Sequence, residues 1–230
     1  MYRKKIGAAQ YLVTRSVARM FELADQYRCP TGHKGKLVAA LMNQEHEPLT
    51  SWGLTKVTIG SDYVVLDVGC GGGRTVNRLA HLAPDGKVFG IDYSVDMVKF
   101  SKKINKTLIA QNRVEIIDES VEKMSFTSDL FDLVTAFETY YFWTNLHNAL
   151  EEIQRVLKPS GKLLLVNELA CEGTKTEMAE KFHLSLFPFE EICSVMMSVG
   201  FRSVQVFTEA ESSWNAILAQ KIVRYSSLKS

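Results

Sequence analysis

The chain has 230 residues, of which 46% are hydrophobic, and its net charge is +1. This size and composition predict one compact globular domain with a substantial core. The balanced charge without a long basic run argues against a nucleic-acid-binding protein, and the lack of a secretory signal or an 18-residue apolar run argues against export and membrane spanning.

The first 60 residues contain two predicted helices separated by a turn. Residues Ala8–Ala24 carry apolar side chains at helical spacing, Cys29–Gly35 is a turn-rich break, and Lys36–Met42 resumes the helical pattern. The segment Asn43–Leu54 follows and contains His46.

A strand, a glycine-rich turn and a helix follow. The strand Val64–Val68 includes Asp67, and the helix Arg74–Ala83 begins directly after the turn. A dinucleotide motif G-x-G-x-x-G beginning at Gly69 fails, because Arg74 occupies its last position. The pattern that fits is D-x-G-x-G-x-G from Asp67 to Gly73. Its carboxylate would repel a pyrophosphate but suits a cationic amino-acid group.

A second strand, Lys87–Asp92, ends in an acidic residue. Asp92 follows Asp67 by 25 residues, near the roughly 20-residue offset at which an acid meets a ribose in dinucleotide folds. A carboxylate can accept hydrogen bonds from both ribose hydroxyls, and the alternative is an acid that only ends the strand. Ser94 is expected to cap the next helix, with Met97 near a bound adenine.

The rest of the chain continues this alternation of strands and helices. Arg155–Val166 holds a turn and then a fifth strand, and Gly200 ends the last helix. The other predicted strands are Val114–Ile117, Phe131–Phe137, Phe201–Phe207 and Trp214–Gln220, and the helices are Leu146–Leu157 and a stripe from Ile192 to Val199.

Four of these segments, in this order, resemble the class I S-adenosylmethionine (SAM) methyltransferases, specifically the methyltransferase type 11-like, small-molecule branch. They are the D-x-G-x-G-x-G turn, the acid ending the second strand, the F-D-x-V fourth strand, and the R-V-L-K-P-S-G turn before the fifth. The resemblance covers roughly residues 60 to 222. It implies an α/β fold: a Rossmann-like, seven-stranded, mostly parallel sheet with helices on both faces and an antiparallel C-terminal hairpin.

The resemblance also implies how the chain divides and which residues hold SAM. Residues 1–60 are expected to form a helical lid over a SAM-binding core of residues 61–230. In the segment that reaches the adenine edge, Ser120 stands where the family usually has aspartate, so Glu119 or a backbone amide is expected to replace it. The expected cofactor-binding residues are Asp67, Gly69, Cys70, Gly71, Asp92, Tyr93, Ser94, Met97, Glu119, Ser120, Val121 and Phe137.

Three residues are the main candidates for catalysis. His46 titrates near neutral pH by residue type and is a candidate general base, or else a capping or surface histidine. Glu138 follows the fourth strand, where it is expected to orient a substrate or to bind the amino group of SAM. Tyr140 belongs to the aromatic run Tyr140–Trp143, which either encloses the sulfonium or packs in the core. Tyr141 and His183 are further candidates.

These observations predict a cytoplasmic enzyme that transfers the methyl group of SAM to a small molecule. The alternatives are a SAM-binding regulator without catalysis and a methyltransferase that acts on a protein side chain. Phe137-Glu138-Thr139-Tyr140 replaces the proline-containing tetrapeptide of DNA-amino methyltransferases. No metal site is expected, because the five histidines lack H-x-x-x-H or H-E-x-x-H spacing and the four cysteines are scattered without a C-x-x-C pair.

Overall fold

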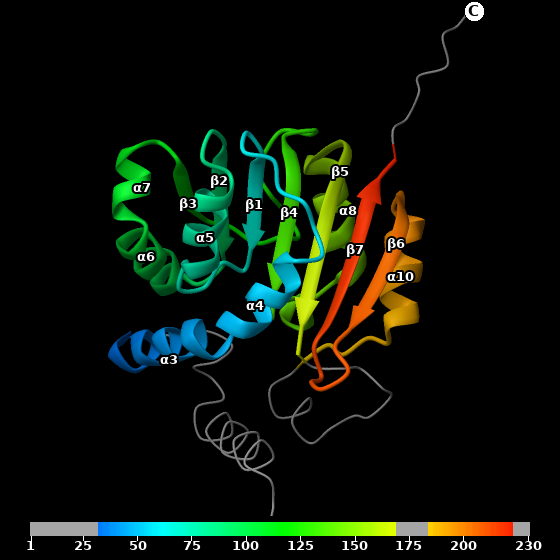
Figure 1. The fold of residues 1–230 in the computed structure, drawn as a ribbon, viewed down its shortest axis with the longest axis horizontal. Coiled ribbons are helices and arrows are strands. Elements are labelled where there is room, and N and C mark those ends of the chain that lie inside the picture. Colours follow the sequence, from blue (N-terminus) through cyan, green and yellow to red (C-terminus); the bar gives the residue numbers. More distant parts are fainter. Residues whose placement is uncertain (1–31, 169–183, 223–230) are drawn as a thin grey trace, which may run out of the picture.

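The computed structural model describes residues 32–168 and 184–222, which form a seven-stranded sheet with helices on both faces (Figure 1). The strand order is β3-β2-β1-β4-β5-β7-β6. Strands β1 to β5 are parallel, and β7 runs antiparallel to β5 and β6. The strands are β1 (Val64–Val68), β2 (Lys87–Asp92), β3 (Val114–Asp118), β4 (Phe131–Phe137), β5 (Leu157–Asn167), β6 (Phe201–Thr208) and β7 (Asn215–Lys221). The fold predicted from the sequence is confirmed.

Helices connect most of the strands and precede the first one. In chain order they are α3 (Gly32–Glu45), α4 (Glu47–Leu54), α5 (Arg74–Leu82), α6 (Val95–Ile104), α7 (Lys106–Ala110), the short 3-10 helix η1 (Tyr140–Phe142), α8 (Leu146–Val156) and α10 (Phe189–Ser198). Helices α5, α8 and α10 lie near their predicted positions, and α6 begins after its predicted cap, Ser94. Helix α3 begins earlier than predicted, and the sequence did not predict α4, α7 and η1.

The hydrophobic core lies on the two faces of the sheet. On one face, Val76 and Leu79 of α5 pack with Leu49 of α4 against β1 and β5. On the other face, Ile153 of α8 and Ile192 of α10 pack against the remaining apolar residues of the strands. Because the central strands are covered on both faces, they appear in the sequence as nearly continuous apolar runs, which is why their bounds could be predicted closely.

Helix α3 begins four residues before the predicted start at Lys36. Gly32 has φ +62, and its amide donates to Asp96 Oδ2 of α6 at 3.0 Å. The Pro- and Gly-rich composition around residue 32 predicts a break as far as Gly35, but the helix starts at Gly32, where a contact with a residue 64 positions away holds the chain. The predicted helix Ala8–Ala24 lies outside the described residues.

The carboxyl ends of the parallel strands meet at one edge of the sheet, and α3 and α4 lie across that edge (Figure 1). Helix α4 packs against the ends of β4 and β5 at Gly53. A Cβ atom at Gly53 would lie 2.7 Å from Val166 Cγ2 and 3.2 Å from Phe137 Cε1. Glycine therefore allows the helix to approach the sheet closely. In open α/β sheets this edge is where ligands bind.

Across residues 32–168 and 184–222, the helices are too short or too polar to cross a membrane. The same described residues contain no group of three or more His, Cys, Asp or Glu side chains arranged to hold a metal ion.

Candidate active site

The turn between β1 and α5 brings backbone close to two neighbouring elements. Gly69 has φ +67, and a side chain there would collide with the hydroxyl of Thr139, which follows β4. Gly72 faces helix α3, because an added Cβ would meet the carboxamide of Asn43. The turn is therefore held between the end of β4 and helix α3; the φ of Gly69 favours glycine, and a larger residue at position 72 would displace the Asn43 side chain.

Asp92, at the end of β2, is held by two backbone amides. Its Oδ2 accepts from Gly71 N at 2.9 Å, and its Oδ1 accepts from Ser94 N at 2.8 Å. Burial raises the pKa of this carboxyl, and the two amides oppose the rise. Each carboxylate oxygen has two acceptor sites, so both oxygens retain one for a ligand in a carboxylate of fixed orientation.

Asp67, at the end of β1, is buried without a cationic partner among the described residues. Only 2% of its surface is exposed, and its Oδ1 accepts from Thr135 Oγ1 at 2.7 Å. Burial raises its pKa to about 7; the Thr135 hydroxyl lowers it, and nearby Asp92 raises it further. A cationic ligand would favour the charged form of this carboxylate.

Two adjoining cavities open at this edge of the sheet. The first lies beneath α3 and α4, and the second extends from the end of β2 toward the segment after β3. They share Gly69, Asp92, Tyr93, Thr139 and Phe142. The second is lined by the apolar residues Val68, Ile91, Val121 and Trp143 and by the polar residues Glu119 and Ser120. A cavity lined by both apolar and polar side chains suits a heterocycle, whose faces are apolar and whose edge carries hydrogen-bonding atoms.

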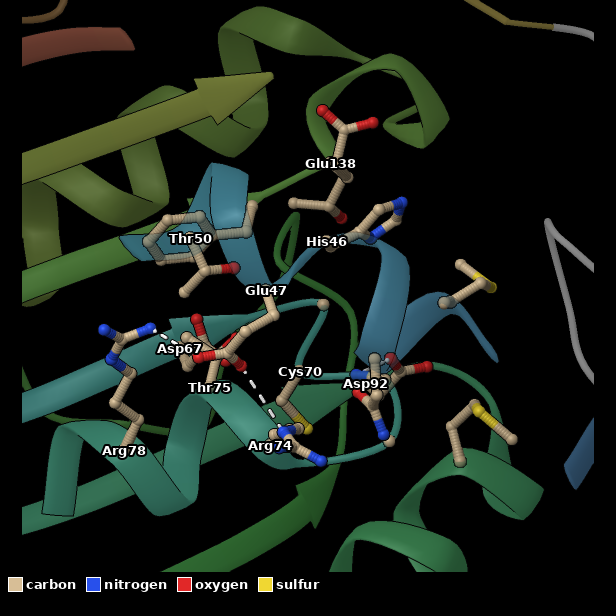
Figure 2. Close-up of a pocket in the computed structure, with 18 of the residues that line it drawn as sticks. His46, Glu47, Thr50, Asp67, Cys70, Arg74, Thr75, Arg78, Asp92 and Glu138 are labelled. Atoms are coloured by element: carbon tan, nitrogen blue, oxygen red, sulfur yellow. Dashed lines mark hydrogen bonds and ion pairs between the residues drawn. The ribbon is translucent and has the colours of Figure 1, made fainter. Parts of the chain in front are cut away.

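Two residues with proton-accepting side chains, His46 and Glu138, line the first cavity (Figure 2). His46 stands between α3 and α4. Burial lowers the pKa of its imidazole, while the nearby carboxylates of Glu168 and Glu45 raise it. The imidazole is therefore an acceptor of protons at neutral pH.

The Glu138 side chain is held in place by its neighbours. Its backbone has φ +54, a conformation that side-chain-bearing residues rarely adopt. One carboxylate oxygen accepts from Tyr141 Oη at 2.7 Å, and the other accepts from Glu168 N. Burial raises the pKa of this carboxyl to about 7, opposed by these two hydrogen bonds. Glu138 can therefore take up a proton near neutral pH.

A family model described as a methyltransferase domain matches residues 59–218, which is more than half of the chain. The chain belongs to the methyltransferase domain family. Its motifs are those of the class I SAM-dependent methyltransferases, as predicted, and the chain spans 60% of the length of one curated relative that it matches and 36% of another.

Individual relatives of this methyltransferase are distant. It is 28% identical to malonyl-[acyl-carrier protein] O-methyltransferase of Geobacter sulfurreducens over 166 residues, which is 66% of this chain and 60% of that enzyme. A SAM-dependent methyltransferase from Aquifex aeolicus superposes with a TM-score of 0.65 at 21% identity, covering 80% of this chain and 98% of that one. Geranyl diphosphate C-methyltransferase from Streptomyces coelicolor, solved with S-adenosylhomocysteine, gives 0.68 at 13% identity, with 75% of each chain covered.

The cavities of the methyltransferase fit SAM. Asp67 lies buried beneath a cavity and has no cationic partner in the described ranges, as an ammonium site requires. Asp92 keeps an acceptor site on each oxygen, as a pair of ribose hydroxyls requires. The second cavity begins at Asp92 and has the apolar lining residues that an adenine needs.

Most residues that the sequence predicts for the methyltransferase site line these cavities. In the first are His46, Glu138, Asp67, Gly69, Cys70, Gly71, Asp92, Tyr93, Met97 and Phe137, and in the second are Glu119, Ser120 and Val121. Burial raises the pKa of the Cys70 thiol well above its usual value, so the thiol is protonated and unsuited to act as a nucleophile.

Three predicted site residues, Ser94, Tyr140 and Tyr141, line neither cavity. The Tyr141 hydroxyl instead donates to Glu138. Ser94 caps α6, accepting from Met97 N at 3.4 Å, and its own amide holds Asp92, so its role is to position another residue. Tyr140 is 0% exposed and packs in the core. We therefore remove Tyr140 from the catalytic candidates, because it packs in the core and, unlike the buried Asp67, lines neither cavity. From its aromatic run, Phe142 lines both cavities and Trp143 the second. His183 lies outside the described residues.

Sequence reasoning did not identify several other cavity-lining residues. Arg74, Thr75 and Arg78 belong to the first turns of α5, and Glu47 belongs to α4. The i, i+4 spacing of the two arginines after the glycine turn was a signal that both face the ligand side of one helix. Nothing in the sequence pairs Glu47 with them.

Proposed function

We propose that this methyltransferase transfers the methyl group of SAM to a small molecule that enters the first cavity beneath α3 and α4. One observation carries the proposal: the cavity that holds Asp67 and Asp92 also holds His46 and Glu138. The two aspartates suit SAM, while a histidine and a glutamate able to accept protons suit a reacting acceptor. A protein that only binds SAM has no need of the second pair.

The proposed roles follow from the charges. SAM supplies a methyl group on a sulfonium, which leaves as a neutral thioether. Asp67 accepts hydrogen bonds from the ammonium group, and Asp92 accepts them from the ribose hydroxyls. Glu138 or His46 removes the proton from an O–H or N–H acceptor: burial raises the pKa of Glu138 to about 7, and it lowers the pKa of His46, which leaves the imidazole uncharged and able to accept a proton. The helices above the cavity hold the acceptor for in-line attack.

The names of the relatives support a small molecule without identifying it. One acts on a malonyl group carried by a protein, another on 2-phytyl-1,4-naphtoquinone, and a structural neighbour on geranyl diphosphate. These acceptors differ in size, charge and the atom methylated. The part of the site that they share with this chain is therefore the part for SAM.

The test is transfer of label from methyl-labelled SAM to a cell extract separated into small-molecule, protein and nucleic-acid fractions. We expect label in the small-molecule fraction with the wild-type chain. Asp92→Ala should abolish it, whereas Asp85→Ala, an exposed aspartate outside both cavities, should retain it. Label in protein would contradict the small-molecule proposal, and SAM binding without transfer to any fraction would favour the regulatory alternative.

A further inference from the structure

Two arginines of α5, Arg74 and Arg78, line the first cavity beside Asp67, and both face Glu47 of α4 (Figure 2). Among the residues that line either cavity in the described ranges, they are the only arginine or lysine side chains. Of the described residues, these two guanidinium groups are therefore the cationic partners open to an anionic group of a ligand in this cavity.

The contacts of Arg78 join α5 to α4. Its Nη1 donates to Glu47 Oε1 at 3.0 Å and to Ser51 Oγ at 2.8 Å, and both partners belong to α4. The side chain is 34% exposed. Because the half-buried guanidinium of Arg78 donates two hydrogen bonds to α4, its role is to hold that helix against α5.

Arg74 is bound much more loosely. Its Nε lies 3.4 Å from Glu47 Oε2, and 63% of its side chain is exposed. An ion pair this long and this exposed contributes little to stability. Arg74 is also the first residue of α5, directly after the glycine turn and next to Thr75, whose side chain lines the same cavity. The N-terminus of this nine-residue helix adds a partial positive charge.

The amino-acid part of SAM carries a carboxylate on the same carbon as its ammonium. When Asp67 holds the ammonium, the carboxylate must lie within a few bonds of Asp67, where Arg74 and Thr75 line the cavity. We infer that Arg74 binds the carboxylate of SAM in exchange for Glu47, while Arg78 keeps its contacts with Glu47 and Ser51. The inference rests on the proposed use of SAM.

This division of roles has a consequence for Glu47. The Glu47 carboxylate competes with the carboxylate of SAM for Arg74. It also holds α4 against α5 through its ion pair with Arg78. Removing its charge should therefore favour ligands that carry a carboxylate over those that do not. A residue that bound SAM directly would show the opposite effect.

The test compares SAM with decarboxylated SAM, which keeps the sulfonium and the ammonium and lacks only the carboxylate. Titration calorimetry gives the dissociation constant of each ligand for the full chain. We expect Arg74→Gln to weaken SAM binding by about tenfold, the scale of one hydrogen bond to a charged group, and to leave decarboxylated SAM unaffected. Glu47→Gln should have the opposite effect: it should raise the affinity for SAM relative to the affinity for decarboxylated SAM.

Two control variants separate this effect from changes in α4 or in the ammonium site. Arg78→Gln should alter both affinities by the same factor, because it loosens α4 without touching the carboxylate. Asp67→Asn should weaken both ligands, because both carry the ammonium. If Arg74→Gln changes the two affinities equally or changes neither, the assignment of Arg74 is overturned. If the wild-type chain binds neither ligand, the proposed use of SAM fails and the inference fails with it.

Discussion

Replacing Asp67 by asparagine should stabilise the free protein while weakening SAM binding. The buried carboxyl has its pKa raised to about 7 from 3.8, mainly by burial. A carboxyl with a raised pKa favours the folded state below pH 3.8 and loses that contribution as the pH rises to about 7. Since each pKa unit corresponds to about 1.36 kcal/mol, the charge of Asp67 costs the free protein up to about 4 kcal/mol above neutral pH.

Asparagine resembles the protonated carboxyl and keeps an oxygen that can accept from Thr135 Oγ1. We therefore expect urea unfolding of the ligand-free variant at pH 7.5 to show a higher free energy of unfolding than wild type, by as much as about 4 kcal/mol. The difference should shrink as the pH falls toward 4. Calorimetry should show SAM affinity reduced by about 1.5–3 kcal/mol, the scale of a lost hydrogen bond to a charged group.

Wild-type protein should also release protons when it binds SAM near pH 7, because a cationic ligand lowers the pKa of Asp67. Calorimetry in buffers of different ionisation enthalpy measures that release, and Asp67→Asn should reduce it. A variant that is less stable than wild type when free, or that binds SAM as tightly, would refute the assignment of Asp67 to the ammonium.

Three further changes test other parts of the site. Asp92→Ala should weaken SAM binding by about 1.5–3 kcal/mol in calorimetry, and unchanged affinity would remove Asp92 from the ribose site. Glu138→Gln should slow transfer and remove a pH dependence near 7 from the rate profile, since burial raises the pKa of this carboxyl to about 7; an unchanged profile would exclude it as the base. Gly72→Ala should displace Asn43 from the glycine turn and destabilise the packing of α3, measured as faster amide exchange in α3, whereas exchange equal to wild type would show that the contact is dispensable.

Much of the fold and of the SAM site could be predicted from the sequence because local patterns determine them. The strand Phe131–Phe137 was predicted with its observed bounds, since an apolar run with an acid near its start is typical of a buried parallel strand. Asp67 and Asp92 were predicted from their places at strand ends, and the topology alone brings such ends together.

Other features depend on contacts between distant parts of the chain. The start of α3 at Gly32 depends on Asp96, and the ion pairs of Glu47 depend on how α4 lies against α5. The orientation of the aromatic side chains after β4 could not be predicted from the sequence either. Tyr140 and Phe142 are equally plausible ligand contacts in the sequence, and the turn of η1 sends the first into the core and the second to the cavities.

The close packing of α4 at Gly53 has a mechanical consequence for helices α3 and α4. With α4 wedged against Val166 and Phe137, it cannot swing without separating from the sheet. Helix α3 packs against α6, where the Gly32 amide donates to Asp96, and it meets the glycine turn where Asn43 lies against Gly72. His46 joins the two helices, so any movement of α3 relative to α4 would turn about this residue. We expect the imidazole of His46 to retract as α3 opens and to return as it closes, so that the proton acceptor is assembled only around an enclosed ligand.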